Sequence, residues 1–345
     1  MAFRHGPSVA GDLLRAYCGC VNCAWHRVCL PGRTRTYTSA MAFAPKRPSA
    51  GLDSSEAAEE GAAALLLAYL QEQLAELLRQ QDRVRGEEPE AIHKMRVSTR
   101  RLRSALASYR RLLEKEPARS LRGDLKWLAQ VLGGARDAQV MRHRLQALVA
   151  SQPPDLVLGP VSARIDEELL SDYSSAVQSV HQALDSDRYG QMVEQLAGLV
   201  ADPPWSQGAT GSGRHAAEAM IRRDRSRLRA RVKEAKAEKD PEKRAEILHE
   251  ARKEAKRLRY AAEAWRPAGG SAAGAMVEAA EGLQKALGEH QDSVVTRSLL
   301  RWMGSTAGEG ENGFTYGRLH AIEEHRGRAA EKSYRRLWKK FPPGP

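Results

Sequence analysis

The sequence predicts an all-α protein, and three observations support that prediction. Apolar residues recur with a helical period of about 3.6 residues through most of the chain after residue 52. No segment alternates apolar and polar residues convincingly, as a half-buried strand would. Two pairs of similar segments recur at offsets of 156 and 155 residues, which indicates an internal duplication. We therefore predict two four-helix bundles related by a pseudo-twofold axis, one from each copy.

Residues 1–52 do not share this helical pattern. The segment has one acidic residue, Asp12, and scattered Gly, Pro, Ser and Thr. A transit peptide has such a composition, whereas Met41 opens a stretch that is typical of an ordinary start. We expect residues 1–52 to be disordered or not natively made, and the sequence leaves open whether residues 1–40 belong to the protein.

All four cysteines lie in this leader, between Cys18 and Cys29. Closely spaced thiols with His26 among them are typical ligands of a small metal site. However, the spacing matches no usual zinc motif and no second ligand pair follows, so metal binding by this cluster stays open. The rest of the chain has no cysteine, which favours a reducing, cytoplasmic setting, and we expect no cofactor there.

Residues from about 53 to 200 form the first predicted half. Asp53 and Glu56 make a capping box for its first helix. Pro117 is expected to end the second helix, and the Gly133-Gly134 pair to separate the third helix from the fourth. Helices are predicted at residues 56–84, 91–113, 118–132, 136–150 and 160–199, with a break in the last near 185–187.

Residues from about 214 to 341 form the second predicted half, after a linker at 201–213 that is rich in Pro, Gly and Ser. Asp240 and Pro241 are an N-cap and a first-turn proline for the second helix of this half. Pro267 and the glycines after it are expected to end that helix. Helices are predicted at residues 214–238, 241–266, 275–288, 290–303 and 314–341.

The segment 91–113 is the most unusual part of the sequence, because it has seven Lys or Arg residues and no acid. At about 100° per residue, four of its basic side chains fall within an arc of about 80°. Met95 and several leucines fall on the opposite side. The four basic residues, called the first cationic stripe below, are His93, Arg96, Arg100 and Arg103.

A second segment, 247–263, aligns with the first at an offset of 156 residues. Its matching basic residues, called the second cationic stripe, are His249, Arg252, Lys256 and Arg259. Glu250 and Glu254 place acids beside this stripe, so it is less purely cationic than the first. If the halves pack about a pseudo-twofold axis, both stripes can line one shared groove or pore.

Downstream of each stripe, a fifteen-residue segment matches at an offset of 155, pairing Gly133 with Gly288 and Asp137 with Asp292. The two aspartates are expected to be structural partners of basic side chains, or helix caps, rather than catalytic acids.

The composition and the stripes favour a polyanionic partner. Lys and Arg number 55 against 43 Asp and Glu, for a formal net charge of +12. Arginine binds phosphate oxygens through a planar fork and keeps its charge at physiological pH. Aromatic residues make up only 6% of the chain, whereas proteins that bind single-stranded nucleic acid stack aromatic side chains on bases. The stripes therefore suit a chain of phosphates without bases.

Four motifs, HKMRVSTRRLRSAL, HEARKEAKRLRYAAE, LGGARDAQV and LGEHQDSVV, together resemble the CHAD family, the conserved histidine α-helical domain. The resemblance covers residues from about 56 to 341. It implies a pair of four-helix bundles with a central basic cavity that binds inorganic polyphosphate. The eight stripe residues then become the first candidates for phosphate contacts, and the weaker candidates are Lys126, Arg222 and Arg229. Such domains are often joined to a triphosphate tunnel enzyme domain, but no Glu-x-Glu-x-Lys motif occurs here.

We therefore predict a non-enzymatic polyphosphate-binding protein of the cytoplasm, with polyphosphate granules as a candidate location. Nucleic-acid binding through the phosphate backbone is the main alternative. A polyphosphate-processing enzyme, or a histidine phosphotransfer domain using His93, is disfavoured because the sequence has no GxxxxGK loop. The plainest alternative is that the stripes are solvated basic faces. No membrane partner is expected, and the sequence leaves homodimer formation open.

Overall fold

The computed structural model describes residues 61–88, 90–207, 213–308 and 312–344. The predicted leader, the Cys18–Cys29 cluster and the Asp53/Glu56 capping box lie outside these residues. Across the described ranges the chain forms eight α-helices and no β-strand, which confirms the all-α prediction. None of these helices combines the length and the apolar character needed to cross a bilayer.

The first part of the chain contributes five of the described helices. They are α3 (Ala62–Arg85), α4 (Ala91–Ser108), α5 (Lys115–Ala150), α6 (Val161–Leu184) and α7 (Asp187–Ala201), with a 3₁₀ turn η1 at Pro154–Leu156. Helix α4 packs between α3 and α5, and α5 packs along α6. Because α4 and α5 are amphipathic, each buries its apolar face in this packing and keeps a basic face outside the core.

The second part contributes α8 (Gly213–Ala237), α9 (Pro241–Ser305) and α10 (Gly313–Lys339). Asp240 caps α9 as predicted, because its carboxylate accepts hydrogen bonds from the amides of Glu242 and Lys243. Helix α9 is kinked at Gly270, which has a φ of 52° and a ψ of −135°. Glycine adopts this backbone conformation readily, whereas it is strained for other residues. The kink follows Pro267, so α9 consists of two helical segments.

Several predicted helix boundaries are wrong. Helix α4 ends at Ser108, and Pro117 lies in the first turn of α5 instead of ending a helix, where a proline costs no backbone hydrogen bond. Helix α5 continues through Gly133 and Gly134, and α9 continues through the predicted break near residue 289. A helix tolerates glycine at a cost of about 1 kcal/mol where close packing offsets it.

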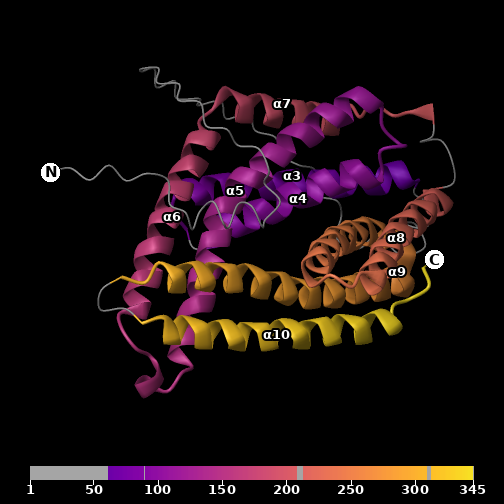
Figure 1. Ribbon diagram of the computed structural model, residues 1–345. Helices are drawn as coiled ribbons and strands as arrows, with labels where there is room; N and C mark the ends of the chain where they lie inside the picture. The colour runs from indigo at the N-terminus through magenta and orange to yellow at the C-terminus, as the bar shows by residue number, and fades with distance from the viewer. Residues whose placement is uncertain (1–60, 89, 208–212, 309–311, 345) are drawn as a thin grey trace.

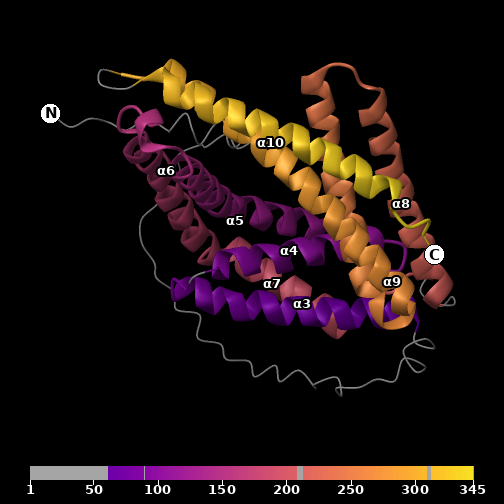
Figure 2. The ribbon, with the colours of Figure 1, turned by 90° about the horizontal axis from the view of Figure 1, so that it is seen from below.

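One hydrophobic core runs through both parts of the chain. It includes the fully buried side chains of Leu66 and Leu106 from the first part and Leu258 and Leu283 from the second. A smaller cluster joins the far ends of α5 and α6 to those of α9 and α10. Figures 1 and 2 show the second segment of α9 lying along α10. The shared core fixes α4 and α5 relative to the first segment of α9. The internal duplication and the pseudo-twofold axis stay predictions.

Candidate functional site

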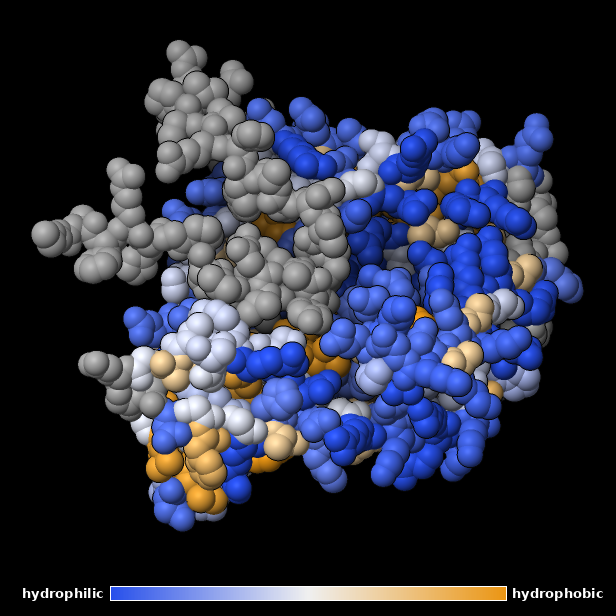
Figure 3. All heavy atoms as spheres, in the orientation of Figure 1, coloured by the Kyte–Doolittle hydropathy of each residue, from blue (hydrophilic) through white to orange (hydrophobic). Residues whose placement is uncertain are grey.

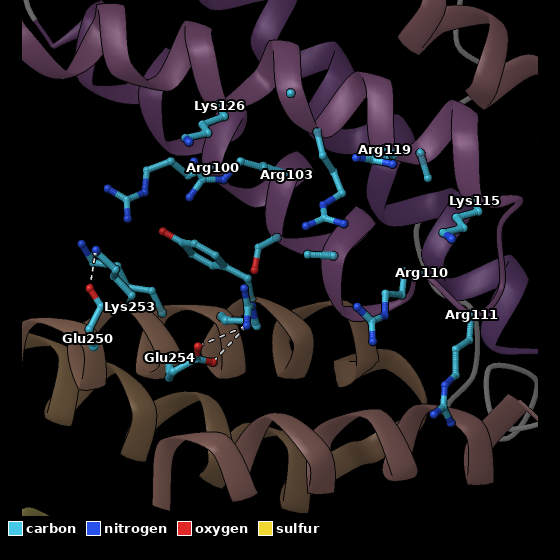
Figure 4. Close-up of a pocket in the computed structure, with 18 residues that line it drawn as sticks. Arg100, Arg103, Arg110, Arg111, Lys115, Arg119, Lys126, Glu250, Lys253 and Glu254 are labelled. Carbon is cyan, nitrogen blue, oxygen red and sulfur yellow. Dashed lines mark hydrogen bonds and ion pairs between the residues drawn. The ribbon is translucent and has the colours of Figure 1, made fainter. Parts of the chain in front are cut away.

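Within the described residues, an elongated cleft of about 910 Å³ lies between α4, the start of α5 and the first segment of α9. Eleven basic and two acidic side chains line it, a formal net charge of +9. Figure 4 shows Lys126 and Lys253 toward one end, and Lys115 and Arg111 at the other. The basic lining of this cleft, called the basic cleft below, consists of Arg100, Arg103, Arg110, Arg111, Lys115, Arg119, Arg122, Lys126, Lys253, Lys256 and Arg257.

Helix α4 directs Arg100 and Arg103 into the basic cleft because its opposite face is buried. Met95, Leu102 and Leu106 are fully buried, so the helical period turns the two arginines away from the core. The sequence predicts this orientation for the first cationic stripe.

Helix α5 adds a row of cations beside those of α4, on the wall that faces α9 (Figure 4). Lys115, Arg119, Arg122 and Lys126 recur at i, i+4, i+7 and i+11, which places them within an arc of about 60° on one helix face. Leucines buried in the core occupy the other face. Only Lys126 is among the candidates from the sequence, although the helical spacing of the other three is a signal that could have found them.

The turn between α4 and α5 contributes Arg110 and Arg111. Just before them, the buried Tyr109 hydroxyl donates a hydrogen bond to the Ala261 carbonyl oxygen of α9 at 3.0 Å. This bond fixes the start of the turn against the helix that forms the other wall. Because α4 ends at Ser108, the helical period of the stripe does not govern the two arginines.

Both acids of the lining are held by cations one turn further along α9. The Glu250 carboxylate pairs with the Lys253 ammonium at 2.7 Å, and the Glu254 carboxylate pairs with the Arg257 guanidinium at 3.1 Å. The acids thus weaken the positive field of the basic cleft without reversing it. Among the described residues, no group of three or more His, Cys, Asp or Glu side chains is placed to hold a metal ion.

Around Arg100 and Lys256, the basic cleft holds like charges close together and partly out of water. Lys256 is only 9% exposed. Burial, together with the charges of Arg100 and Arg252, lowers the pKa of Lys256 well below that of an ordinary lysine. Burial and the charge of Arg96 lower the pKa of Arg100 to about 10. A bound anion would relieve this repulsion and stabilise the charged form of each side chain.

The same repulsion continues along the walls. Burial lowers the pKa of Arg103 and of Arg122, and the positive charge of Arg257 lowers both further. Ser104, the residue after Arg103, also lines the cleft, and its hydroxyl is buried and has no hydrogen-bond partner within the described chain. A buried polar group without a partner is costly, and an anion that accepted a hydrogen bond from this hydroxyl would remove that cost.

The basic cleft contains only some of the candidates from the sequence. Arg96 and Arg252 are close enough to act on Lys256 but do not line the cleft. The Arg96 guanidinium pairs with Asp137 at 3.2 Å. A Cβ added at Gly288 would lie 3.3 Å from the Arg252 guanidinium, so a larger residue there would displace this arginine. The candidates that line the cleft are Arg100, Arg103, Lys126 and Lys256.

The two stripe histidines lie outside the lining. Burial, followed by the charges of Lys253 and Arg252, lowers the pKa of His249 to about 4. Burial and the charge of Arg136 lower the pKa of His93. Both ring nitrogens of His249 are buried and lack a hydrogen-bond partner in the described residues. The two imidazoles are therefore mainly uncharged at neutral pH.

Three further candidates are also placed away from the basic cleft. Arg259, the match of Arg103 in the second stripe, pairs with Glu263 at 2.8 Å and with Glu281 at 3.4 Å. Its charge is therefore compensated within the protein. Arg222 and Arg229 are exposed on α8 and do not line the cleft.

Comparisons with known proteins agree with the fold. The family model of the CHAD domain matches residues 68–301. The chain is similar to PptA from Streptomyces chartreusis, with a TM-score of 0.67 and 22% identity over 81% of this chain and 100% of that one. It is also similar to the CHAD domain from the plant Ricinus communis, with a TM-score of 0.62 and 25% identity over 86% of this chain and 96% of that one.

Two curated relatives come from Mycobacterium tuberculosis, Uncharacterized protein MT2285 from strain CDC 1551 and Uncharacterized protein Rv2226 from strain H37Rv. Each is 35% identical over 253 residues, which cover 73% of this chain and 48% of the relative. The chain therefore spans about half the length of these relatives.

Proposed function

Because the chain belongs to the CHAD domain family, we propose that it binds inorganic polyphosphate in the basic cleft and leaves the polymer uncut. The observation that carries this proposal is the lining, in which eleven cations face two acids that are already ion-paired. The family resemblance supports polyphosphate as the ligand, and the charge and elongated form of the cleft support this place as the site.

The donors of the cleft suit phosphate oxygens. Seven of the eleven cations are arginines, whose planar forks can each bind two oxygens of one phosphate. The Ser104 hydroxyl adds an uncharged donor to the lining. Tyr260 is the one aromatic residue of the lining and is only 7% exposed, so it offers little face for a base to stack on. This favours polyphosphate over single-stranded nucleic acid.

Binding without turnover also fits the state of the acids. Glu250 and Glu254 are each held by a cation, and a paired carboxylate is a poor base. We propose in addition that the protein collects on polyphosphate granules, because each granule presents many copies of the ligand. A fluorescent fusion whose location is the same in cells with and without polyphosphate would contradict this part of the proposal.

The test is competition binding of labelled long-chain polyphosphate against RNA and duplex DNA across a salt series. The cleft variant is Arg119→Glu with Lys126→Glu, since both residues are exposed and line the cleft. The control is Arg222→Glu with Arg229→Glu, which makes the same charge change at exposed positions outside the cleft. Polymer length is checked after incubation.

We expect the cleft variant to lose polyphosphate binding by about 100-fold or more, whereas the control loses less than about tenfold. Polyphosphate should remain bound at salt concentrations that release RNA and DNA, and its length should not change. Equal losses in the two variants would mean that only net charge matters and would contradict the site. Equal binding of all three polyanions would favour the nucleic-acid alternative, and shortened polymer would indicate an enzyme.

A further inference from the structure

One end of the basic cleft opens beside α8. Arg110, Arg111 and Lys115 are exposed at this end. The Arg223 guanidinium of α8 donates a hydrogen bond at 2.6 Å to the carbonyl oxygen of Ser108, the last residue of α4. Arg223 is therefore placed next to the turn that carries the two arginines. Figure 3 shows a strongly hydrophilic surface over α8 and the first segment of α9.

A single buried carboxylate organises the basic side chains at this end. Asp224 is fully buried, and the Ser108 hydroxyl donates to it at 2.6 Å. The Arg227 guanidinium lies 3.2 Å from the Asp224 carboxylate, and the Arg223 guanidinium lies 3.8 Å from it. The Asp224 carboxylate thus holds both arginines, and the three side chains together keep a net positive charge. We call Arg223 and Arg227 the α8 platform.

The α8 platform keeps donors for a ligand. A guanidinium has five N–H donors, and the contacts just given use only part of them. The Arg223 side chain is 23% exposed and the Arg227 side chain 35%, so water or an anion can reach both.

The charges of the α8 platform and of the basic cleft also act on one another. Burial lowers the pKa of Arg223, and Asp224 opposes that effect. The positive charges of Arg227, Arg110 and Arg111 lower this pKa further. Two of these charges belong to the basic cleft, so the cleft and the α8 platform form one continuous positive field.

We propose that the binding path for the polyanion continues from the basic cleft onto the α8 platform, which therefore contacts only chains too long to fit within the cleft. The proposal rests on the proposed function and adds chain-length preference to it. A short polyphosphate occupies the cleft alone. A longer one leaves the cleft past Arg110 and Arg111 and gains contacts with Arg223 and Arg227.

The test measures affinity over a length series from tripolyphosphate to long-chain polymer. The platform variant is Arg223→Gln with Arg227→Gln. The matched control is Arg222→Gln with Arg229→Gln, which removes two charges from the same helix at positions about 100° or more around its axis from the α8 platform. Thermal unfolding checks that each variant is folded. Arg227→Gln alone replaces the double variant if loss of the Ser108 contact destabilises the protein, and Arg227→Lys tests whether the charge suffices.

We expect wild-type affinity to rise with chain length, and the platform variant to lose about 3- to 10-fold for long chains with tripolyphosphate unchanged. The control should retain wild-type values for both, and Arg227→Lys should keep most of the affinity for long chains. Equal losses for short and long chains, no loss at all, or a wild-type affinity independent of length would each overturn the inference. In those cases the cleft variant described above still decides the proposed function separately.

Discussion

Replacing His249 with glutamine should make the protein less sensitive to acid. Burial, followed by the charges of Lys253 and Arg252, lowers the pKa of His249 to about 4, and Glu250 opposes this effect. In the unfolded chain the histidine titrates near its ordinary pKa of about 6.5. Between these values the unfolded state binds more protons than the folded state. The free energy of unfolding therefore falls as the pH falls through this window.

The size of the effect follows from the two pKa values. Between pH 7 and pH 4.5, a group with a pKa of about 4 when folded and about 6.5 when unfolded changes stability by roughly 2 to 3 kcal/mol. The side chain is partly exposed, and solvent screening reduces this to about 2 kcal/mol. Glutamine does not titrate, so the His249→Gln variant is spared this fall in stability at acid pH. At pH 7 its stability should be close to that of the wild type.

Urea unfolding at pH 7 and at pH 4.5 measures the effect. The control is His143→Gln, since His143 is exposed on α5. The free energy of unfolding of His249→Gln should fall about 2 kcal/mol less between the two pH values than that of the wild type or the control. The histidines other than His249 and His143 contribute equally to all three proteins. Equal acid sensitivity in all three would refute the assignment of His249 as a neutral histidine whose ring nitrogens are buried.

Three other outcomes are expected. Glu254→Gln frees Arg257 and removes a negative charge from the basic cleft. Polyphosphate affinity measured by calorimetry should therefore rise about threefold. A decrease would contradict the proposed site. Glu323→Gln breaks the ion pair between this fully buried carboxylate and Arg144. The free energy of unfolding, measured in urea, should fall by about 3 kcal/mol. A fall of less than about 1 kcal/mol would mean that the ion pair adds little to stability. The polyphosphate binding constant should fall as salt concentration rises, because eleven cations line the cleft. A plot of the logarithm of the binding constant against the logarithm of salt concentration should have a slope between about −3 and −8. A slope near zero would exclude binding through phosphates.

The sequence predicted the helices well where local chemistry determines them. Asp240 and Pro241 form a local N-terminal signal, and α9 begins where they predict. Gly133 and Gly134 are local signals that a helix ends, yet α5 continues through them. Gly133 is buried in the helix, and its neighbours compensate the low helix propensity of glycine. Propensity therefore gave the wrong answer where tertiary packing is strong.

Periodicity alone identified part of the basic cleft. Arg100 and Arg103 fall on the basic face of a helix whose apolar face is buried, so their direction follows from the helical period. Lys115 and Arg119 have equally regular spacing, and the sequence could have placed them on one face of α5. Arg110 could not be placed in this way, because it lies in a turn whose position depends on contacts with α9.

The choice between chemically similar arginines was decided by tertiary structure. Arg103 and Arg259 occupy matching positions of the two stripes, and the sequence treats them alike. In the folded chain Arg103 faces the cations of the basic cleft, whereas Arg259 meets the carboxylates of Glu263 and Glu281. By itself, the sequence determined the helical class, the positive charge and the faces of α4 and α9 that carry it. Whether a given cation is left for a ligand depends on charges brought within about 4 Å by packing, and only the tertiary structure sets those distances.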